Sequence, residues 1–268
     1  MPSWIIIGAA RGIGFEYVTQ LSATSDNQVI ALIRSQGTAS ALNALAGQRS
    51  NIHVVEADIF SPDSLGEAVA KVEKSTNGAL DVLVHNAYSA GTDAMFFTAS
   101  QFTGKETELN HELTETIKAN VIGPMLTINA FLPLIRKGTE KKLIYISSGA
   151  GDVDMTRNSR LAAQIGYSAS KAGGNVVMAK YAGELATEAI KTLSISPGWV
   201  ETPATEGLTE DPAVYDYLFN AFKRIQPNVS GMIKAEQSVK AQLEVIAKLD
   251  AEGSGAFVSH HGDQQWVD

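Results

Sequence analysis

Short apolar runs alternate with longer stretches of helical periodicity along most of the 268-residue chain. The runs Ile5-Ile6-Ile7, Val82-Leu83-Val84 and Leu143-Ile144-Tyr145-Ile146 contain no alternating polar positions. Strands that are buried on both faces have this composition, as in a parallel sheet covered by helices. The pattern therefore predicts repeated strand–helix units joined by right-handed crossovers.

The order of these segments predicts the architecture of the whole chain. Strands are expected at 4–8, 28–34, 52–56, 80–85, 143–147, 191–196 and 255–259, with helices at 12–23, 38–46, 62–75, about 106–136, about 166–188 and 235–249. No long linker separates these segments, so residues 1–268 are expected to form one domain. The predicted fold is a single-domain α/β Rossmann fold, a doubly wound, mostly parallel seven-stranded sheet with helices on both faces.

One stretch, at about 202–234, interrupts this regular alternation. It contains three prolines and four aromatic residues, Pro203, Pro212, Pro227, Tyr215, Tyr217, Phe219 and Phe222. We expect a semi-helical insertion that forms an apolar lid over a substrate site.

Composition and charge exclude several classes of function. The chain carries 21 basic and 29 acidic residues, a net charge of −8, and no cysteine. A net acidic chain without basic runs argues against nucleic acid or an anionic membrane as partner. The absence of cysteine excludes disulfides and cysteine-type metal sites. The early apolar run at 4–10 is too short to span a bilayer and lacks the flanks of a signal peptide, so a cytoplasmic location is expected.

A glycine-rich turn follows the first predicted strand. The segment Gly8-Ala9-Ala10-Arg11-Gly12-Ile13-Gly14 leads into the first predicted helix. Glycines permit positive φ and close approach of a phosphate, and the helix N-terminus offers free N–H groups to a pyrophosphate. A strand before and a helix after are the context of a dinucleotide site.

The end of the second predicted strand indicates which dinucleotide binds. NAD sites usually carry an acidic residue there for the ribose 2′-hydroxyl. Here the strand ends Ile33-Arg34-Ser35, without a carboxylate. Arg34, with Arg11 from the glycine turn, can pair with a 2′-phosphate, unless both are simply solvated surface residues. We therefore predict NADP(H) as cofactor, with NAD(H) less favoured.

A tyrosine and a lysine provide candidate acid–base chemistry. Tyr167 and Lys171 lie four residues apart, on one face of a predicted helix. An unperturbed phenol is a poor acid or base at neutrality, but a nearby cation lowers its pKa. The pair can thus serve as a tunable proton donor and acceptor.

Together these motifs resemble those of the short-chain dehydrogenase/reductase family, in the family's order over about residues 3–202. Besides the glycine turn and the Tyr–Lys pair, the resemblance rests on Asp58-Ile59, Asn86-Ala87, Asn120, Ser147-Ser148 and Pro197-Gly198-Trp199-Val200-Glu201-Thr202. The sequence of the last segment is most similar to that of the carbonyl reductase and C-factor-like branch.

The resemblance implies a role for each catalytic residue. Tyr167 would protonate the carbonyl oxygen as hydride arrives, or deprotonate an alcohol in reverse. Lys171 would lower the pKa of that phenol and bind the nicotinamide ribose. Ser148, more than Ser147, would bind the substrate oxygen, and Asn120 would anchor a water that relays protons to Lys171.

The resemblance also implies the cofactor-binding residues. Val200 and Thr202 would hold the nicotinamide carboxamide, and Asp58 would lie on the adenine side. The complete predicted set is Gly8, Arg11, Gly12, Ile13, Gly14, Arg34, Asp58, Ile59, Asn86, Ala87, Tyr167, Lys171, Pro197, Gly198, Val200 and Thr202.

Three features depart from the family pattern. His85 replaces an asparagine, Tyr88 stands where glycine is usual, and Ser148 and Tyr167 lie 19 positions apart, more than is common. We expect the extra residues, about 151–161, to form a longer polar loop at the rim of the pocket.

Two further groups of residues were weighed for other roles. No two histidines lie at helical metal spacing, and His260 and His261 would point to opposite sides of an extended segment, so no metal site is predicted. The apolar patch Val176-Val177-Met178 is expected either in the core or in a subunit contact.

The sequence thus predicts an NADP(H)-dependent oxidoreductase that transfers a hydride between nicotinamide and a small carbonyl or alcohol substrate. A homodimer or homotetramer is left open. The alternative is a dinucleotide-binding signalling or sensor protein of C-factor-like type without significant turnover. Four intact catalytic residues favour the enzyme, because a sensor does not need all of them.

Overall fold

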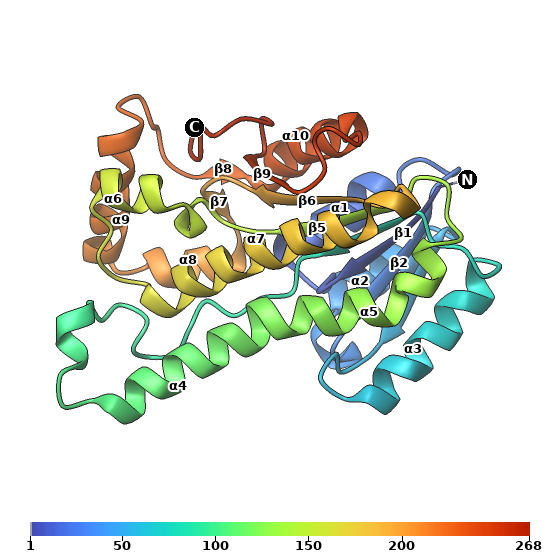
Figure 1. Cartoon of the computed structure of the whole chain (residues 1–268), viewed down its shortest axis with the longest axis horizontal. Coiled ribbons are helices and arrows are strands. Elements are labelled where there is room, and N and C mark those ends of the chain that lie inside the picture. Colours follow the sequence, from blue (N-terminus) through green and yellow to red (C-terminus); the bar gives the residue numbers. More distant parts are fainter. Residues whose placement is uncertain (1) are drawn as a thin grey trace.

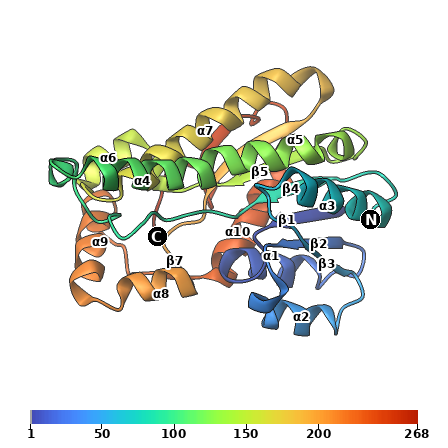
Figure 2. The ribbon, with the colours of Figure 1, turned by 90° about the horizontal axis from the view of Figure 1, so that it is seen from below.

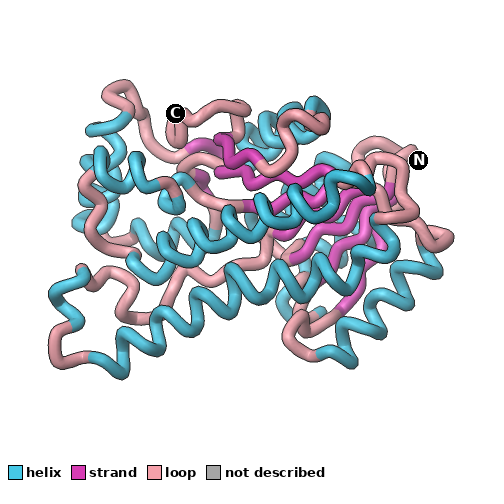
Figure 3. Tube along the Cα trace, in the orientation of Figure 1, coloured by secondary structure: helices cyan, strands magenta, loops and turns pink. Residues whose placement is uncertain are grey.

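A seven-stranded parallel sheet forms the centre of the molecule in the computed structural model, which describes residues 2–268 (Figures 1 and 3). Its strands, in spatial order, are β3 (Ile52–Glu56), β2 (Gln28–Ile33), β1 (Ser3–Ile7), β4 (Val82–His85), β5 (Lys142–Ile146), β6 (Lys191–Ser196) and β9 (Ala256–Ser259). The order reverses between β1 and β4. In open α/β sheets, ligands bind beside the carboxyl ends of the strands at such a switch point.

Helices cover both faces of the sheet, as Figure 2 shows. One face carries α3 (Pro62–Ser75), α5 (Gly123–Ile135) and α7 (Ile165–Leu185), and the other carries α1 (Gly12–Leu21), α2 (Ser40–Ala46) and α10 (Ala235–Lys248). Neighbouring residues of β1 serve the two faces in turn, since Ile5 and Ile7 belong to the first core and Ile6 to the second. This explains why the strands are apolar without alternation, and it confirms the predicted fold class.

Local capping signals fix helix boundaries that the sequence predicted. α3 begins at Pro62, a residue well suited to the first helical position, and the Ser61 hydroxyl accepts a hydrogen bond from the Ser64 amide. Leu65, Ala68 and Val72 then recur at helical spacing and are buried against the sheet.

A continuous helical stretch runs through α4 (Glu106–Ile117), the π-helical segment η3 (Lys118–Ile122) and α5. By length and composition alone, Glu106–Ile135 could also cross a membrane. The stretch packs on α7, α3 and the sheet, and helices in the core of a soluble protein commonly have the same composition.

A third apolar cluster lies beyond the carboxyl ends of the strands, apart from the two cores on the sheet. It gathers side chains from α6 (Val153–Ser159), α9 (Pro212–Ile225) and the C-terminal segment. A short sheet of β7 (Val200–Glu201) and β8 (Ile233–Lys234) and helix α8 (Pro203–Thr209) complete this region.

Two expectations are modified here. The stretch at about 202–234 contains two helices, α8 and α9, and is more regular than expected. The expected polar loop at 151–161 contains helix α6 instead, because the Asp152 carboxylate caps its N-terminus and Met155 and Leu161 are buried in the third cluster.

Candidate active site

The glycine turn lies at the carboxyl end of β1 and has no room for a side chain at Gly8 or Gly14. A Cβ on Gly14 would lie 2.2 Å from the Gly8 carbonyl oxygen, and one on Gly8 would lie 2.8 Å from the Ala87 amide nitrogen. Gly8 and Gly12 also have positive φ, of 87° and 57°. Asn86 supports the turn, since its Nδ2 donates to the Gly8 carbonyl at 3.0 Å. The backbone here forms a cradle at the N-terminus of α1, which suits a pyrophosphate.

The loop after β6 lies against this turn. Gly198 has φ of 86°, and Thr202 caps α8, where its hydroxyl accepts from the Thr205 amide. The Thr202 side chain lies next to Gly12, since a Cβ on Gly12 would be 3.5 Å from Thr202 Cβ. Two predicted cofactor segments, almost 190 residues apart in sequence, are thus adjacent.

Ser148, Tyr167 and Lys171 line one cavity beside these segments. The predicted residues Ile13, Asn86, Ser148, Tyr167, Lys171, Pro197, Gly198, Val200 and Thr202 all contribute to its wall. Ser148 follows β5, while Tyr167 and Lys171 lie on the first turns of α7. Ser147 is buried and donates to Asn175 Oδ1 at 2.6 Å, so Ser148 is the serine available to a substrate.

Lys171 is almost fully buried and has an unusual environment for an amine. Its Nζ donates to the Ile146 carbonyl at 2.8 Å and lies 4.7 Å from the ring centre of Tyr145 and 5.8 Å from that of Tyr167. Burial lowers the pKa of Lys171 to about 7. A substantial fraction of the amine is therefore neutral at physiological pH.

The expected lowering of the Tyr167 pKa by Lys171 is not found in this structure. Burial of the phenol raises the pKa of Tyr167, the neighbouring Tyr88 raises it further, and only a hydrogen bond with Ser148 lowers it. The physical reason is that Lys171 directs its amine to the Ile146 carbonyl and, with a pKa of about 7, has already lost its proton at the pH at which Tyr167 would ionise. Tyr167 is consequently protonated at neutral pH, which is the form that a proton donor needs.

Tyr88 and His85, two of the three departures from the family pattern, have separate roles. Tyr88 is 46% exposed, lines the cavity, and meets Tyr167 edge-on with ring centres 6.2 Å apart. His85 is buried, and its Nδ1 lies 2.9 Å from Thr127 Oγ1. Burial lowers the pKa of His85 to about 3, so it is a neutral residue of the core.

Asn120 lies outside the cavity wall, fully buried in the π-helical segment η3. Its side chain accepts from the Ser89 amide at 2.9 Å and donates to the Ser89 carbonyl at 2.8 Å and to Ser170 Oγ at 2.9 Å. The backbone carbonyl of Asn120 accepts a hydrogen bond from the Tyr145 hydroxyl at 2.9 Å. Asn120 thus ties the loop after β4 to α7, and its proposed water relay remains a prediction.

The residues predicted for the adenosine end lie along the same edge of the sheet. Arg34 follows β2, and both Arg34 and Arg11 are exposed. Within the described part of the chain, neither guanidinium forms a hydrogen bond or an ion pair. The Asp58 carboxylate accepts from the Phe60 amide at 2.9 Å and so shapes the loop after β3, which also contains Ile59.

The sequence did not predict most of the far wall of the cavity. This wall is apolar and consists of Met155, Leu161, Trp199, Leu218, Phe222, Trp266 and Val267. Among the predicted lid residues, Leu218 and Phe222 face the cavity, while Tyr215 and Phe219 pack beside Trp199. The aromatic content of 202–234 indicated part of this wall, and residues 151–161, which include Met155, were expected at the rim of the pocket, but as a polar loop; nothing in the sequence marked Trp266.

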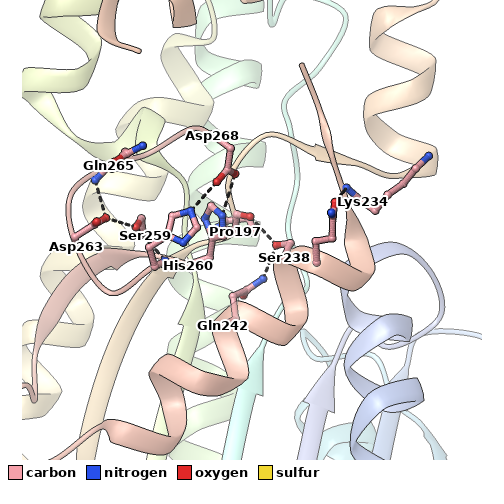
Figure 4. A network of polar contacts seen from close by, with 11 residues as sticks. Pro197, Lys234, Ser238, Gln242, Ser259, His260, Asp263, Gln265 and Asp268 are labelled. Carbon is pink, nitrogen blue, oxygen red and sulfur yellow. Dashed lines mark hydrogen bonds and ion pairs between the residues drawn. The ribbon is translucent and has the colours of Figure 1, made fainter. Parts of the chain in front are cut away.

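The expectation that His260 and His261 point to opposite sides is wrong. Both follow β9 in a turn, not in an extended segment, and their ring centres are 4.0 Å apart. The Asp268 carboxylate lies between them, 3.0 Å from His260 Nε2 and 2.6 Å from His261 Nε2. Figure 4 shows Asp268 beside His260. The three side chains bring possible metal-ligand atoms within 4.8 Å of one another, but the carboxylate can accept hydrogen bonds from both rings without a metal.

Comparisons with known proteins agree with this geometry. A family model described as short chain dehydrogenase matches residues 3–213. The short-chain dehydrogenase/reductase atnB of Arthrinium sp. is 46% identical over the full length of both chains, and AacuF of Aspergillus aculeatus is 38% identical over the full length of both. An NADPH-bound carbonyl reductase from chicken fatty liver has the same fold, with 27% identity, a TM-score of 0.78 and 98% of each chain covered.

Proposed function

The chain belongs to the short-chain dehydrogenase/reductase family, and we propose that it is an NADPH-dependent reductase of ketones or aldehydes that carry apolar or aromatic groups. One observation carries the proposal. Tyr167, Ser148 and Lys171 line a single cavity that also touches the glycine turn and the loop after β6.

The cofactor proposal rests on the fit of the residues that would hold it. The cradle of Gly8, Gly12 and Gly14 would take the pyrophosphate, because its tight backbone turn tolerates no Cβ without a clash or strain and leaves the N-terminus of α1 open. The exposed guanidinium groups of Arg11 and Arg34 would take a 2′-phosphate. When bound, NADPH supplies the hydride. The chicken carbonyl reductase, which is similar in fold, was solved with NADPH.

The chain's own residues supply the proton and the orientation. The Ser148 hydroxyl would donate a hydrogen bond to the substrate carbonyl and so place its oxygen beside Tyr167. Tyr167 carries its proton at neutral pH, since its pKa is raised. The oxygen becomes a stronger base than a phenolate as the hydride arrives, so the proton can pass to it. Lys171 lies within 6 Å of the Tyr167 ring, and the part of it that is protonated near pH 7 would stabilise the phenolate that forms during the reaction.

The apolar far wall supports the class of substrate. Trp199, Leu218, Phe222 and Trp266 offer large hydrophobic surfaces and few hydrogen-bonding groups. A substrate with a charged or heavily hydroxylated substituent would lose hydration there without compensation. We propose that α8 and α9 cover this part of the cavity as a lid.

The test is NADPH oxidation by the purified protein over a panel of aliphatic and aromatic aldehydes and ketones, with product identification. We expect turnover that favours apolar aryl compounds, and a loss of about 10²-fold or more in kcat/KM for Ser148→Ala. Tight NADPH binding without turnover of any compound would overturn the proposal and favour the sensor. Equal turnover by Ser148→Ala would refute the assigned role of the serine.

A further inference from the structure

The C-terminal segment, residues 262–268, folds back toward the cavity after β9. A tight turn reverses the chain, because the Gly262 amide donates to the Ser259 carbonyl at 2.9 Å and Gly262 has φ of 85°. The Asp263 carboxylate then fixes the direction, accepting from Ser259 Oγ at 2.6 Å and from the Gln265 amide at 2.9 Å (Figure 4). This segment lies beyond the residues that the family model matches.

Trp266 and Val267 from this segment form part of the cavity wall, and both are more than nine-tenths buried. The Trp266 indole stacks on Phe257 of β9, with ring centres 4.5 Å apart. On its other side it meets Gly149, where a Cβ would lie 2.8 Å from Trp266 Cβ. Gly149 directly follows Ser148, so the indole is packed beside the serine that would hold the substrate oxygen.

The end of the segment is held by the two imidazoles. Asp268 has only acceptor oxygens when ionised, so its hydrogen bond with His261 places a proton on that Nε2, and His260 Nε2 lies 3.0 Å from the other carboxylate oxygen. His260 is 2% exposed, and burial lowers its pKa, which favours the neutral ring. A Cβ on Gly198 would lie 2.8 Å from His260 Cε1. The contact with Asp268 therefore connects the segment to the loop proposed to hold nicotinamide.

We infer that Trp266 is a specificity-determining residue that limits the bulk of the carbonyl substrate, and that the His260–Asp268–His261 contact holds it in place. The inference deepens the proposed reductase function and rests on it. The indole occupies space next to Ser148 that a larger aryl substituent would need. Because Asp268 is two residues from Trp266, loosening its contact would let the indole withdraw.

The test compares two aryl ketones of different bulk, acetophenone and 4-acetylbiphenyl, with NADPH. We expect Trp266→Ala to raise the ratio of kcat/KM for the larger ketone over the smaller at least 10-fold. Trp266→Phe, which keeps an aromatic side chain, should raise it less and also serves if the alanine variant does not fold. Gln265→Ala, an exposed neighbour, is the matched control and should leave the ratio unchanged.

Asp268→Asn tests the positioning role. An amide keeps the size of the side chain but can accept from only one imidazole through its oxygen. We expect Asp268→Asn to raise the ratio of kcat/KM for the larger ketone over the smaller by at least 3-fold, as Trp266→Ala does. His261→Gln retains a hydrogen-bond donor for Asp268 and should keep most of the wild-type ratio. A merely structural role would lower activity toward both ketones equally.

Dissociation constants of both ketones for the NADP⁺ complex, measured by calorimetry, separate this inference from the proposed function. If the wild type binds the ketones without turnover, the reductase proposal fails. The ratio of the two dissociation constants then still tests whether Trp266 limits the bulk of the bound ketone. A ratio within 2-fold of wild type in Trp266→Phe and Asp268→Asn would overturn the inference. Failure of the wild type to bind either ketone would overturn both.

Discussion

The buried amine of Lys171 should make the stability of the protein depend on pH, and Lys171→Met should remove that dependence. Methionine has a similar length and carries no charge. Lys171 is 2% exposed, and the pKa of its amine in the folded chain is about 7, against an ordinary value of 10.5. Between these two values the unfolded chain retains a proton that the folded chain has released, so stability rises with pH in that window.

The change in stability with pH follows from the pH range between the folded and unfolded pKa values of Lys171. Each pH unit within it changes the free energy of unfolding by about 1.4 kcal/mol. From pH 6 to pH 9, about two units lie within the window, so the Lys171 contribution should become more favourable by about 3 kcal/mol. Below pH 7 the full cost of charging the buried amine remains, about 5 kcal/mol. The lost hydrogen bond to the Ile146 carbonyl offsets part of the gain in the variant, by about 1–3 kcal/mol.

The assay is urea unfolding of wild type and Lys171→Met at pH 6 and pH 9 without cofactor. The variant should be the more stable protein at pH 6, and its advantage should shrink by about 3 kcal/mol at pH 9. Other titrating groups are common to both proteins and cancel in the difference. Lys180→Met, on the exposed face of the same helix, is the matched control. An advantage of equal size at both pH values would refute the assigned burial of the charge.

Three further substitutions test other parts of the account. Arg34→Ala should raise KM for NADPH about 10-fold or more while leaving KM for NADH nearly unchanged, because only NADPH has the 2′-phosphate; steady-state kinetics with an equal loss for both cofactors would contradict this. Gly14→Ala should abolish NADPH binding in fluorescence titration, since its Cβ would lie 2.2 Å from the Gly8 carbonyl oxygen, and unchanged affinity would show that the turn is not the cradle. Val176, which is 59% exposed on α7, was weighed as a subunit contact, so Val176→Lys should lower the mass of any oligomer seen by light scattering, and an unchanged oligomer would place the contact elsewhere.

The fold could be predicted because its signals are local. Continuous apolar runs mark strands that are covered on both faces, and Ser61-Pro62 marks the start of α3. Helix α6 was missed because five of its seven residues are polar and only Met155 and Val153 are apolar. Its burial depends on α9, which lies about 60 residues away in sequence.

The site was predictable to the extent that its chemistry is encoded in short spacings. Tyr167 and Lys171 are brought together by one helical turn, and the glycine turn is contiguous in sequence. The pKa directions were not predictable, because burial around Lys171 comes from segments far apart in the chain. The same holds for Trp266, an isolated residue whose place in the cavity depends on the turn at Gly262.

The most direct test of the central claim is the proton-donor role of the Tyr167 hydroxyl. The measurement is the single-turnover rate of NADPH oxidation with an aryl ketone at saturating cofactor, for wild type and Tyr167→Phe. Phenylalanine keeps the ring and removes only the hydroxyl, so we predict a fall of about 10²–10⁴-fold with NADPH affinity unchanged. A rate undiminished in Tyr167→Phe would contradict the account.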